Sequence, residues 1–236
     1  MGKTTIHANC LNCDARFKSV FCDLNSENLE TLNSHKSCGL YKKGAQIFAE
    51  GQRPYGLYCI NQGKIKIFQT GNEGKDQIVR LAKEGDIIGY RALLSGTMYT
   101  ATAEAIDEAS VCFVPKEVFF GLINNEMPLS MELMKLLSLD LKRAENKITN
   151  LAQKPVRQRM AEALLFIKET YGFEEDGITI NVTLSREDIA NIVGTATETA
   201  IRLISDLKAE EVVSQKGKRI QILDHFKLVE LSGIEE

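Results

Sequence analysis

The pattern of hydrophobic and polar positions divides the chain into three regions of different texture. Between about residues 40 and 115, short apolar runs such as 56–60, 64–68 and 77–81 are separated by turns that contain glycine. The run at 64–68 alternates charged and apolar residues, which is the periodicity of a β-strand. Short strands separated by glycine turns are typical of an antiparallel barrel or jelly roll, so we predict a β-roll here.

The second region has the periodicity of a helix. From about Leu129 to Leu151, apolar residues recur at alternating spacings of three and four, and polar residues fill the other positions. An amphipathic helix packed on its own core is one interpretation, but a stripe this narrow favours a seam between two paired helices. The predicted dimer interface consists of Met134, Leu137, Leu141, Ala144, Ile148 and Leu151.

The third region, from Pro155 to the end, has the order of elements found in a winged helix-turn-helix. Ser185 followed by Asp188 resembles an N-terminal capping box, and Gly194 interrupts the helical pattern that follows. Two short helices joined by a glycine-containing turn, with a hairpin after them, form this DNA-binding motif. We expect helices at 157–171, 187–193 and 197–209, a short strand at 178–182 and the hairpin, or wing, at 212–222.

These textures predict an α+β protein with an N-terminal antiparallel β-roll of the jelly-roll type, a long dimerisation helix and a C-terminal winged helix-turn-helix. The long helix would lie in the chain between a sensor and a DNA-binding domain. The expected domains are a cysteine-containing segment at 1–25, a β-roll sensor domain at 26–127, the dimerisation helix at 128–153 and the DNA-binding domain at 154–236.

The composition is that of a folded globular protein, with 44% hydrophobic and 26% charged residues among 236. No apolar run reaches the roughly 18 residues that span a bilayer, and the N-terminus lacks the apolar core of a signal peptide. We therefore expect a cytoplasmic protein with no membrane partner. The net charge of −3 argues mildly against DNA binding, so a small face must supply the positive field: Lys154, Arg157, Arg186, Arg202, Lys216, Lys218 and Arg219.

The pattern of residues does not indicate an enzyme. A cupin-like enzyme, which is the alternative, would place two or three histidines and a carboxylate in the barrel, whereas residues 40–115 contain no histidine. The chain also shows neither a Ser-His-Asp set nor a phosphate-binding loop. A second alternative is a cyclic-nucleotide module that does not bind DNA, such as a kinase regulatory subunit, which would lack the winged helix.

The helix predicted at 197–209 begins with side chains suited to reading DNA bases. Glu198 and Arg202 are four residues apart and share one helix face. The pair could be an ordinary surface ion pair. Glutamate can instead accept a hydrogen bond from cytosine N4, and arginine can bind guanine O6 and N7 together.

The whole segment 184–203 resembles the signature of the CRP/FNR superfamily of transcription regulators, the cyclic-AMP receptor and fumarate-nitrate reduction type. The resemblance extends over nearly the whole chain and is strongest to members from Bacteroidetes-type bacteria. It implies a homodimer on a palindromic site in double-stranded DNA, with RNA polymerase as a further partner. It also implies a β-roll like that of cyclic-nucleotide-binding domains.

The resemblance also assigns roles to individual residues. It implies that Glu198 and Arg202 contact bases, and that Arg186 and Thr199 lie near the phosphate backbone. The chain departs from the family at Thr197, where the cyclic-AMP branch has arginine, and at Ile201, where the oxygen-sensing branch has serine. The flanking base preference is therefore not predicted. The expected DNA-binding residues are Arg186, Thr197, Glu198, Thr199, Ile201, Arg202, Lys216 and Lys218.

The sensor region departs from the cyclic-AMP branch at the residues that hold the nucleotide. Tyr90 stands where that branch has the ribose-binding glutamate, and Tyr99 and Thr100 replace its Arg-Ser pair. Without that arginine a buried phosphate would be an unpaired charge, so cyclic AMP is not the expected effector. The predicted effector pocket comprises Gly89, Tyr90, Tyr99 and Thr100.

The cysteines suggest a redox or metal function. The oxygen-sensing branch carries three N-terminal cysteines and one in the β-roll, so the resemblance implies a [4Fe–4S] cluster held by Cys10, Cys13, Cys22 and Cys112. The gap before Cys22 is eight residues, where the family has about five. The alternatives are zinc on the same thiolates, a redox dithiol at the C-x-x-C formed by Cys10 and Cys13, or no function.

Cys38 and Cys59 are expected to be small buried hydrophobic residues, and a reducing cytosol would leave the chain without structural disulfides. Haem is a further alternative, with His7 or His35 as the available ligand, but nothing in the neighbouring sequence identifies either histidine as one.

Overall fold

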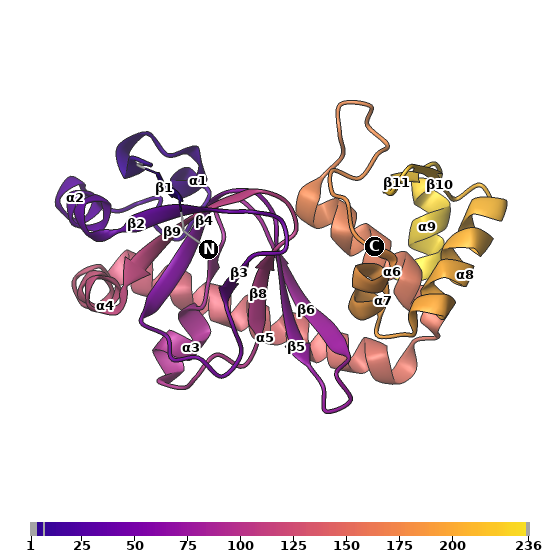
Figure 1. The fold of residues 1–236 in the computed structure, drawn as a ribbon, viewed down its shortest axis with the longest axis horizontal. Coiled ribbons are helices and arrows are strands. Elements are labelled where there is room, and N and C mark those ends of the chain that lie inside the picture. The colour runs from indigo at the N-terminus through magenta and orange to yellow at the C-terminus, as the bar shows by residue number, and fades with distance from the viewer. Residues whose placement is uncertain (1–3, 7, 235–236) are drawn as a thin grey trace. The chain divides into compact units, whose positions relative to one another are not determined.

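The computed structural model describes residues 4–6 and 8–234 of the chain. It divides into two compact units (Figure 1). One comprises Met1–Gln69 with Arg80–Leu141, and the other comprises Thr70–Val79 with Lys142–Glu236. No helix within the described residues combines the length and the apolar character needed to cross a membrane.

Two antiparallel sheets form the β-roll predicted from the sequence. One sheet has the strand order β1-β2-β9-β4-β7, and the other has the order β3-β8-β5-β6. The apolar runs that predicted strands coincide with β4, β5 and β6. The strands are β1 Thr4–Ile6, β2 Ser37–Tyr41, β3 Gln46–Phe48, β4 Gly56–Gln62, β5 Ile65–Thr70, β6 Asp76–Ala82, β7 Ile87–Ile88, β8 Thr102–Ala105 and β9 Ala109–Pro115.

One helix that precedes strand β2 in the chain and one that follows strand β9 pack on the five-stranded sheet. Helices α2 (Ser26–His35) and α4 (Lys116–Asn125) both pack on strand β9, and α4 also packs on β4. Their apolar faces bury Leu32 and Phe119 together with Leu57 and Val114 of the sheet. Each such side chain contributes roughly 1.5–3 kcal/mol by leaving water, so this cluster is a main source of stability in the unit.

The N-terminal cysteine segment forms a short 3-10 helix η1 (Cys10–Asn12) and a single helical turn α1 (Asp14–Phe17). The side chain of Asn9 caps η1 by accepting a hydrogen bond from the amide of Leu11. Helix α1 contacts strand β4, and η1 contacts helix α2. The segment therefore lies on the β-roll and forms part of the same unit.

Helix α5 (Met127–Gln153) is the long helix that the sequence predicted. Leu129 and Leu133 are buried in the core of the β-roll unit. Along the predicted seam, Met134, Leu141 and Ile148 are 51%, 61% and 68% exposed. Much of the apolar stripe is thus left uncovered within a single chain, and the remaining seam residues are Leu137, which is half-buried, and Ala144 and Leu151, which are exposed.

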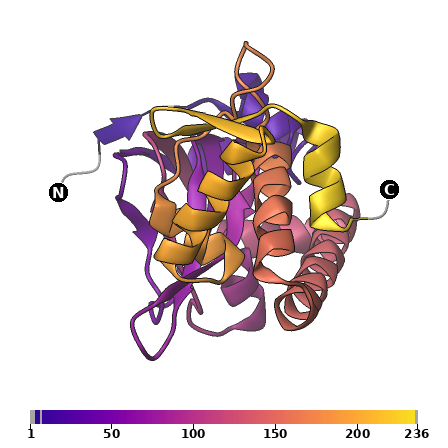
Figure 2. The same ribbon diagram turned by 90° about the vertical axis from the view of Figure 1, so that its right-hand side faces the viewer.

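The C-terminal part of the second unit is a winged helix-turn-helix, as predicted (Figure 2). Ser185 and Asp188 form the capping box at the start of α7, and Gly194 ends this helix with a φ of 73° that favours glycine. Helix α6 packs on α9, and α7 packs on α8. The elements are α6 Val156–Tyr171, α7 Arg186–Val193, α8 Thr197–Ala209, β10 Val213–Lys216, β11 Arg219–Ile222 and α9 His225–Ser232.

The strand predicted at 178–182 is wrong. This segment forms only two isolated bridges, Phe173 with Ile180 and Thr179 with Gln221. The carboxylate of Asp176 accepts hydrogen bonds from the amides of Ile178 and Thr179 and from the hydroxyl of Thr179. These local bonds hold the chain in a turn, which competes with the ladder of a strand.

Candidate DNA-binding and sensory sites

Helix α8 presents the predicted base-reading residues to solvent. Its buried face carries Leu203 and Ile204, while Glu198 and Arg202 are exposed and Ile201 is 49% exposed. Among the described ion pairs none involves Glu198 or Arg202, so the surface salt bridge considered as an alternative does not form. Both side chains are available to an external partner.

The other expected DNA-binding residues lie at the edges of this helix or on separate elements. Thr197 and Thr199 are half-buried in the first turn of α8. Arg186 is the first residue of α7, and burial lowers the pKa of its guanidinium. Lys216 and Lys218 are exposed in the β10–β11 hairpin. Their contacts with DNA stay a prediction.

Ion pairs remove part of the expected positive face. Arg157 binds Glu210 with N–O distances of 2.6 and 2.7 Å. Arg219 lies 2.5 Å from Glu174. Lys154 lies 3.5 Å from Glu162, so it is also partly neutralised. The cations of this face without an ion pair in the described residues are Arg186, Arg202, Lys216 and Lys218.

In the β-roll, Tyr90 takes part in a buried polar network that the sequence did not predict. Its hydroxyl donates a hydrogen bond of 2.6 Å to Asp140 of helix α5. Arg80 of strand β6 lies 3.5 Å from the same carboxylate and 3.4 Å from the tyrosine hydroxyl. Burial raises the pKa of Tyr90 to about 12, against a smaller opposite effect of Arg80. Tyr90 is therefore neutral and is held by the protein itself.

Tyr99 is also committed to contacts inside the chain. Its ring stacks on Phe48 with centroids 4.1 Å apart, and its hydroxyl donates to the carbonyl of Gly56 at 3.3 Å. Gly89 faces this ring, because a Cβ built there would lie 3.2 Å from Tyr99 Cε1. Thr100 is exposed instead. Of the predicted effector residues, the structure brings Gly89 and Tyr99 together. The side chains of Tyr90 and Tyr99 are both buried.

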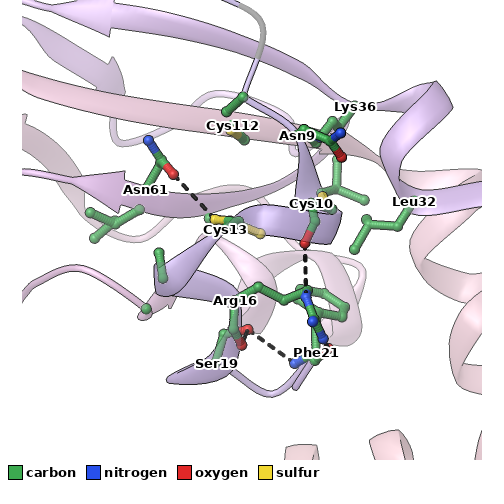
Figure 3. Close-up of a pocket in the computed structure, with 16 residues that line it drawn as sticks. Asn9, Cys10, Cys13, Arg16, Ser19, Phe21, Leu32, Lys36, Asn61 and Cys112 are labelled. Carbon is green, nitrogen blue, oxygen red and sulfur yellow. Dashed lines mark hydrogen bonds between the residues drawn. The ribbon is translucent and has the colours of Figure 1, made fainter. Parts of the chain in front are cut away.

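Four cysteines line one cavity of about 40 Å³ in the β-roll unit (Figure 3). Cys10 and Cys13 come from the N-terminal segment, Cys59 from β4 and Cys112 from β9. The half-buried thiol of Cys13 donates a hydrogen bond of 3.2 Å to the side-chain oxygen of Asn61. The sequence assigned no role to Cys59, because a lone cysteine in an apolar strand looks like a core residue.

The predicted ligand set for an iron–sulfur cluster does not fit this arrangement. Cys112 forms a disulfide with Cys38, and Cys22 does not line the cavity. Arg16 binds the carbonyl of Cys22 at 2.6 Å and that of Cys10 at 2.9 Å. Within the described residues no group of three or more His, Cys, Asp or Glu side chains could hold a metal ion. The expectation that the chain has no disulfide is also wrong, because strand register sets Cys38 directly opposite Cys112.

The haem alternative gains no support from either histidine. His7 lies outside the described residues. The Nδ1 atom of His35 lies 2.8 Å from the carbonyl oxygen of Thr31 and 3.0 Å from the hydroxyl of Ser34. This ring nitrogen is thus occupied by the helix that carries it.

Comparison with known proteins decides the family. A family model of the cyclic nucleotide-binding domain matches residues 40–126, and one of the Crp-like helix-turn-helix domain matches residues 158–231. The chain is 30% identical over 239 residues to the fumarate and nitrate reduction regulatory protein of Vibrio cholerae serotype O1, covering all of this chain and 94% of the relative. The chain belongs to the CRP/FNR family of transcription regulators.

Two further comparisons agree with membership of the CRP/FNR family. The transcriptional activator protein Anr of Pseudomonas protegens is 26% identical over 230 residues, which are 96% of this chain and 93% of Anr. A solved CRP/FNR family regulator from Thermus thermophilus superposes with a TM-score of 0.71 at 27% identity, covering 84% of this chain and 100% of that one. The family points to transcription regulation and DNA binding rather than to catalysis.

Proposed function

We propose that this CRP/FNR regulator acts as a homodimer that reads a palindromic DNA site through helix α8 of each subunit. The observation that carries the proposal is the exposure of Glu198 and Arg202, without ion-pair partners, on one face of that helix. In helix-turn-helix proteins the second helix enters the major groove and its first turns contact base edges. Arg202 would bind guanine, and Glu198 would accept from cytosine of the same half-site.

The exposed apolar stripe of α5 supports the homodimer. Met134, Leu141 and Ile148 are each about half exposed or more, although they repeat with heptad spacing. Pairing with α5 of a second copy would remove this surface from water and would set the two recognition helices about one turn of DNA apart, roughly 34 Å. A regulator bound in this way at a promoter would have RNA polymerase as its further partner.

Cyclic AMP is not part of the proposed function. Tyr90 is hydrogen-bonded to Asp140, and Tyr99 is stacked on Phe48. A bound nucleotide would have to displace these contacts. The proposed function also uses no iron–sulfur cluster, because Cys112 is bonded to Cys38 and Cys22 does not line the cavity that Cys10, Cys13 and Cys112 share.

The test is a footprint on a palindromic site selected from random DNA. It compares the wild type with two variants of helix α8, in each of which one cationic side chain is replaced by alanine. Arg202→Ala should weaken specific binding by about 1–3 kcal/mol and relax the preference for guanine at one position of each half-site. Lys208→Ala is the matched control, because Lys208 is an exposed cation at the other end of α8. Equal affinity and an unchanged footprint for Arg202→Ala would refute the proposed mode of binding.

A further inference from the structure

Three cysteines occupy directly opposite positions on three neighbouring strands. In the five-stranded sheet, Cys38 of β2 is paired with Cys112 of β9, and Cys112 is also paired with Cys59 of β4. Directly opposite residues of antiparallel strands project from the same face of a sheet. The three sulfur-bearing side chains therefore form a row, with Cys112 in the middle and already bonded to Cys38.

The C-x-x-C of the N-terminal segment covers this row. Cys10 and Cys13 line the same cavity as Cys59 and Cys112, and Cys38 does not line it. Burial raises the pKa of Cys59, and Cys10 and Cys13 add smaller contributions in the same direction. Lys36 also lines the cavity and brings a positive charge beside these sulfur atoms.

We propose that this cavity is a thiol–disulfide exchange site, in which the Cys10–Cys13 dithiol reduces the Cys38–Cys112 disulfide. The proposal concerns the β-roll unit alone, so it stands or falls independently of the proposed mode of DNA binding. It assigns a reaction to the C-x-x-C, and its partner is a disulfide of the same chain rather than a metal.

The exchange needs no external oxidant or reductant. The Cys13 thiolate attacks Sγ of Cys112, a Cys13–Cys112 bond forms, and Cys38 leaves as a thiolate that takes up a proton. The Cys10 thiolate then attacks Sγ of Cys13, a Cys10–Cys13 bond forms, and Cys112 leaves and is protonated. One disulfide is consumed and one is made, and two electrons pass from the N-terminal segment to the strand pair.

The geometry selects the roles of the four sulfur atoms in this exchange. Cys112 is the sulfur that is attacked, because it faces the cavity and Cys38 does not. Cys13 is the attacking thiol, because it is only partly buried, whereas Cys10 is buried. Cys59 lies opposite Cys112, but burial raises its pKa far above the usual value and leaves it protonated.

Exchange would also change how the unit is held together. The Cys38–Cys112 bond joins residues 74 apart in sequence and links strands β2 and β9 of the five-stranded sheet. A Cys10–Cys13 bond closes only a very short loop. Because a long-range crosslink restricts the unfolded chain more than a short one does, the exchanged form should unfold at a lower temperature.

The exchange is tested on the full chain, isolated with one disulfide in each molecule. The protein is held without oxygen at pH 8, quenched with acid, alkylated and digested, and its disulfide peptides are identified by mass spectrometry. The wild type should contain both Cys38–Cys112 and Cys10–Cys13 peptides. Cys10→Ser should accumulate the mixed Cys13–Cys112 peptide together with alkylated Cys38, because no thiol remains to complete the second step.

Two more variants make the outcome decisive. Cys13→Ser should keep Cys38–Cys112 intact, and it supplies the test if Cys10→Ser folds poorly. Cys22→Ser should behave as the wild type, because Cys22 lies outside the cavity. The proposal is overturned if every sample contains only Cys38–Cys112, or if the mixed disulfide forms with Cys59 or Cys22 instead of Cys13.

Discussion

The hydroxyl of Tyr90 donates a hydrogen bond of 2.6 Å to the carboxylate of Asp140. Tyr90 begins helix α3 (Tyr90–Ser95) of the β-roll, and Asp140 belongs to helix α5, whose exposed stripe we assign to the dimer. Asp140 is only 8% exposed, and Arg80 lies beside it. The bond therefore ties the region predicted as an effector pocket to the helix that would join two subunits.

Replacing Tyr90 by phenylalanine keeps the ring and removes the hydroxyl, with its hydrogen bond to Asp140 and the longer one that it accepts from Arg80. We expect Tyr90→Phe to lower the free energy of unfolding by about 1–3 kcal/mol, because a buried carboxylate loses a hydrogen-bond donor. Chemical denaturation with urea measures the change. Tyr55→Phe is the control, since Tyr55 is 74% exposed. Equal losses in the two variants would mean that the bond contributes nothing of its own.

The titration of Tyr90 should be visible at high pH. Burial raises its pKa to about 12, whereas tyrosine in an unfolded chain titrates near about 10. The raised pKa favours the folded state below pH 10, and this contribution is lost as the pH rises towards 12. In absorbance titrations of tyrosinate, the difference between wild type and Tyr90→Phe should appear near pH 12. A difference centred near pH 10 would contradict the buried network.

Charged residues in the α5 stripe should separate the subunits. Leu141→Glu with Ile148→Glu is preferred over a change at Leu137, because Leu137 also packs on the core of its own chain. We expect the double variant to be monomeric by light scattering and to lose specific DNA binding. Asn146→Glu, an exposed position outside the stripe, should remain dimeric. A dimeric Leu141→Glu, Ile148→Glu variant would place the interface elsewhere.

Cyclic AMP should not bind with useful affinity. Tyr90 and Tyr99 are 1% and 5% exposed and are held by contacts within the chain. Calorimetric titration should therefore give no heat of binding at micromolar concentrations of the nucleotide. Saturable binding in that range would show that the aromatic side chains move aside.

Protein that carries the Cys38–Cys112 disulfide should contain neither iron nor sulfide. One of the four cysteines predicted to hold a cluster is then bonded to another residue, and Cys22 does not line the cavity that the other three share. Iron and sulfide analysis, with disulfide mapping of the same anaerobic sample, measures both quantities together. A brown protein in which the disulfide is intact and iron is present would contradict the assignment of Cys112.

The winged helix could be predicted almost to the residue because its boundaries depend on local chemistry. The side chains of Ser185 and Asp188 cap α7, each accepting a hydrogen bond from the backbone amide of the other, and Gly194 ends the helix with a conformation that favours glycine. The helix predicted at 197–209 is α8 as observed. The error at 178–182 has a local cause too, because Asp176 stabilises a turn in a segment whose composition suits a strand.

The sensory region could not be predicted to the same depth, because its contacts join distant parts of the chain. The Cys38–Cys112 bond depends on the register of two strands, and the sequence gives no sign of which strands pair. Asp140 stands between apolar residues of α5 at a position outside the heptad stripe, where an exposed acid would be expected. Only the fold shows that Arg80 and Tyr90 surround it.

The ion pairs of Lys154, Arg157 and Arg219 bear on how the regulator would behave when a cell changes its internal salt. With those cations engaged, Arg186, Lys216 and Lys218 remain in each subunit to displace potassium from phosphates. Three such contacts per subunit correspond to a log–log salt slope of about −5 for the dimer, which is modest for a DNA-binding protein. By that slope a doubling of the internal salt would weaken binding about 30-fold, so promoter occupancy would fall during osmotic stress, while the bases that Glu198 and Arg202 read would still decide which site is bound.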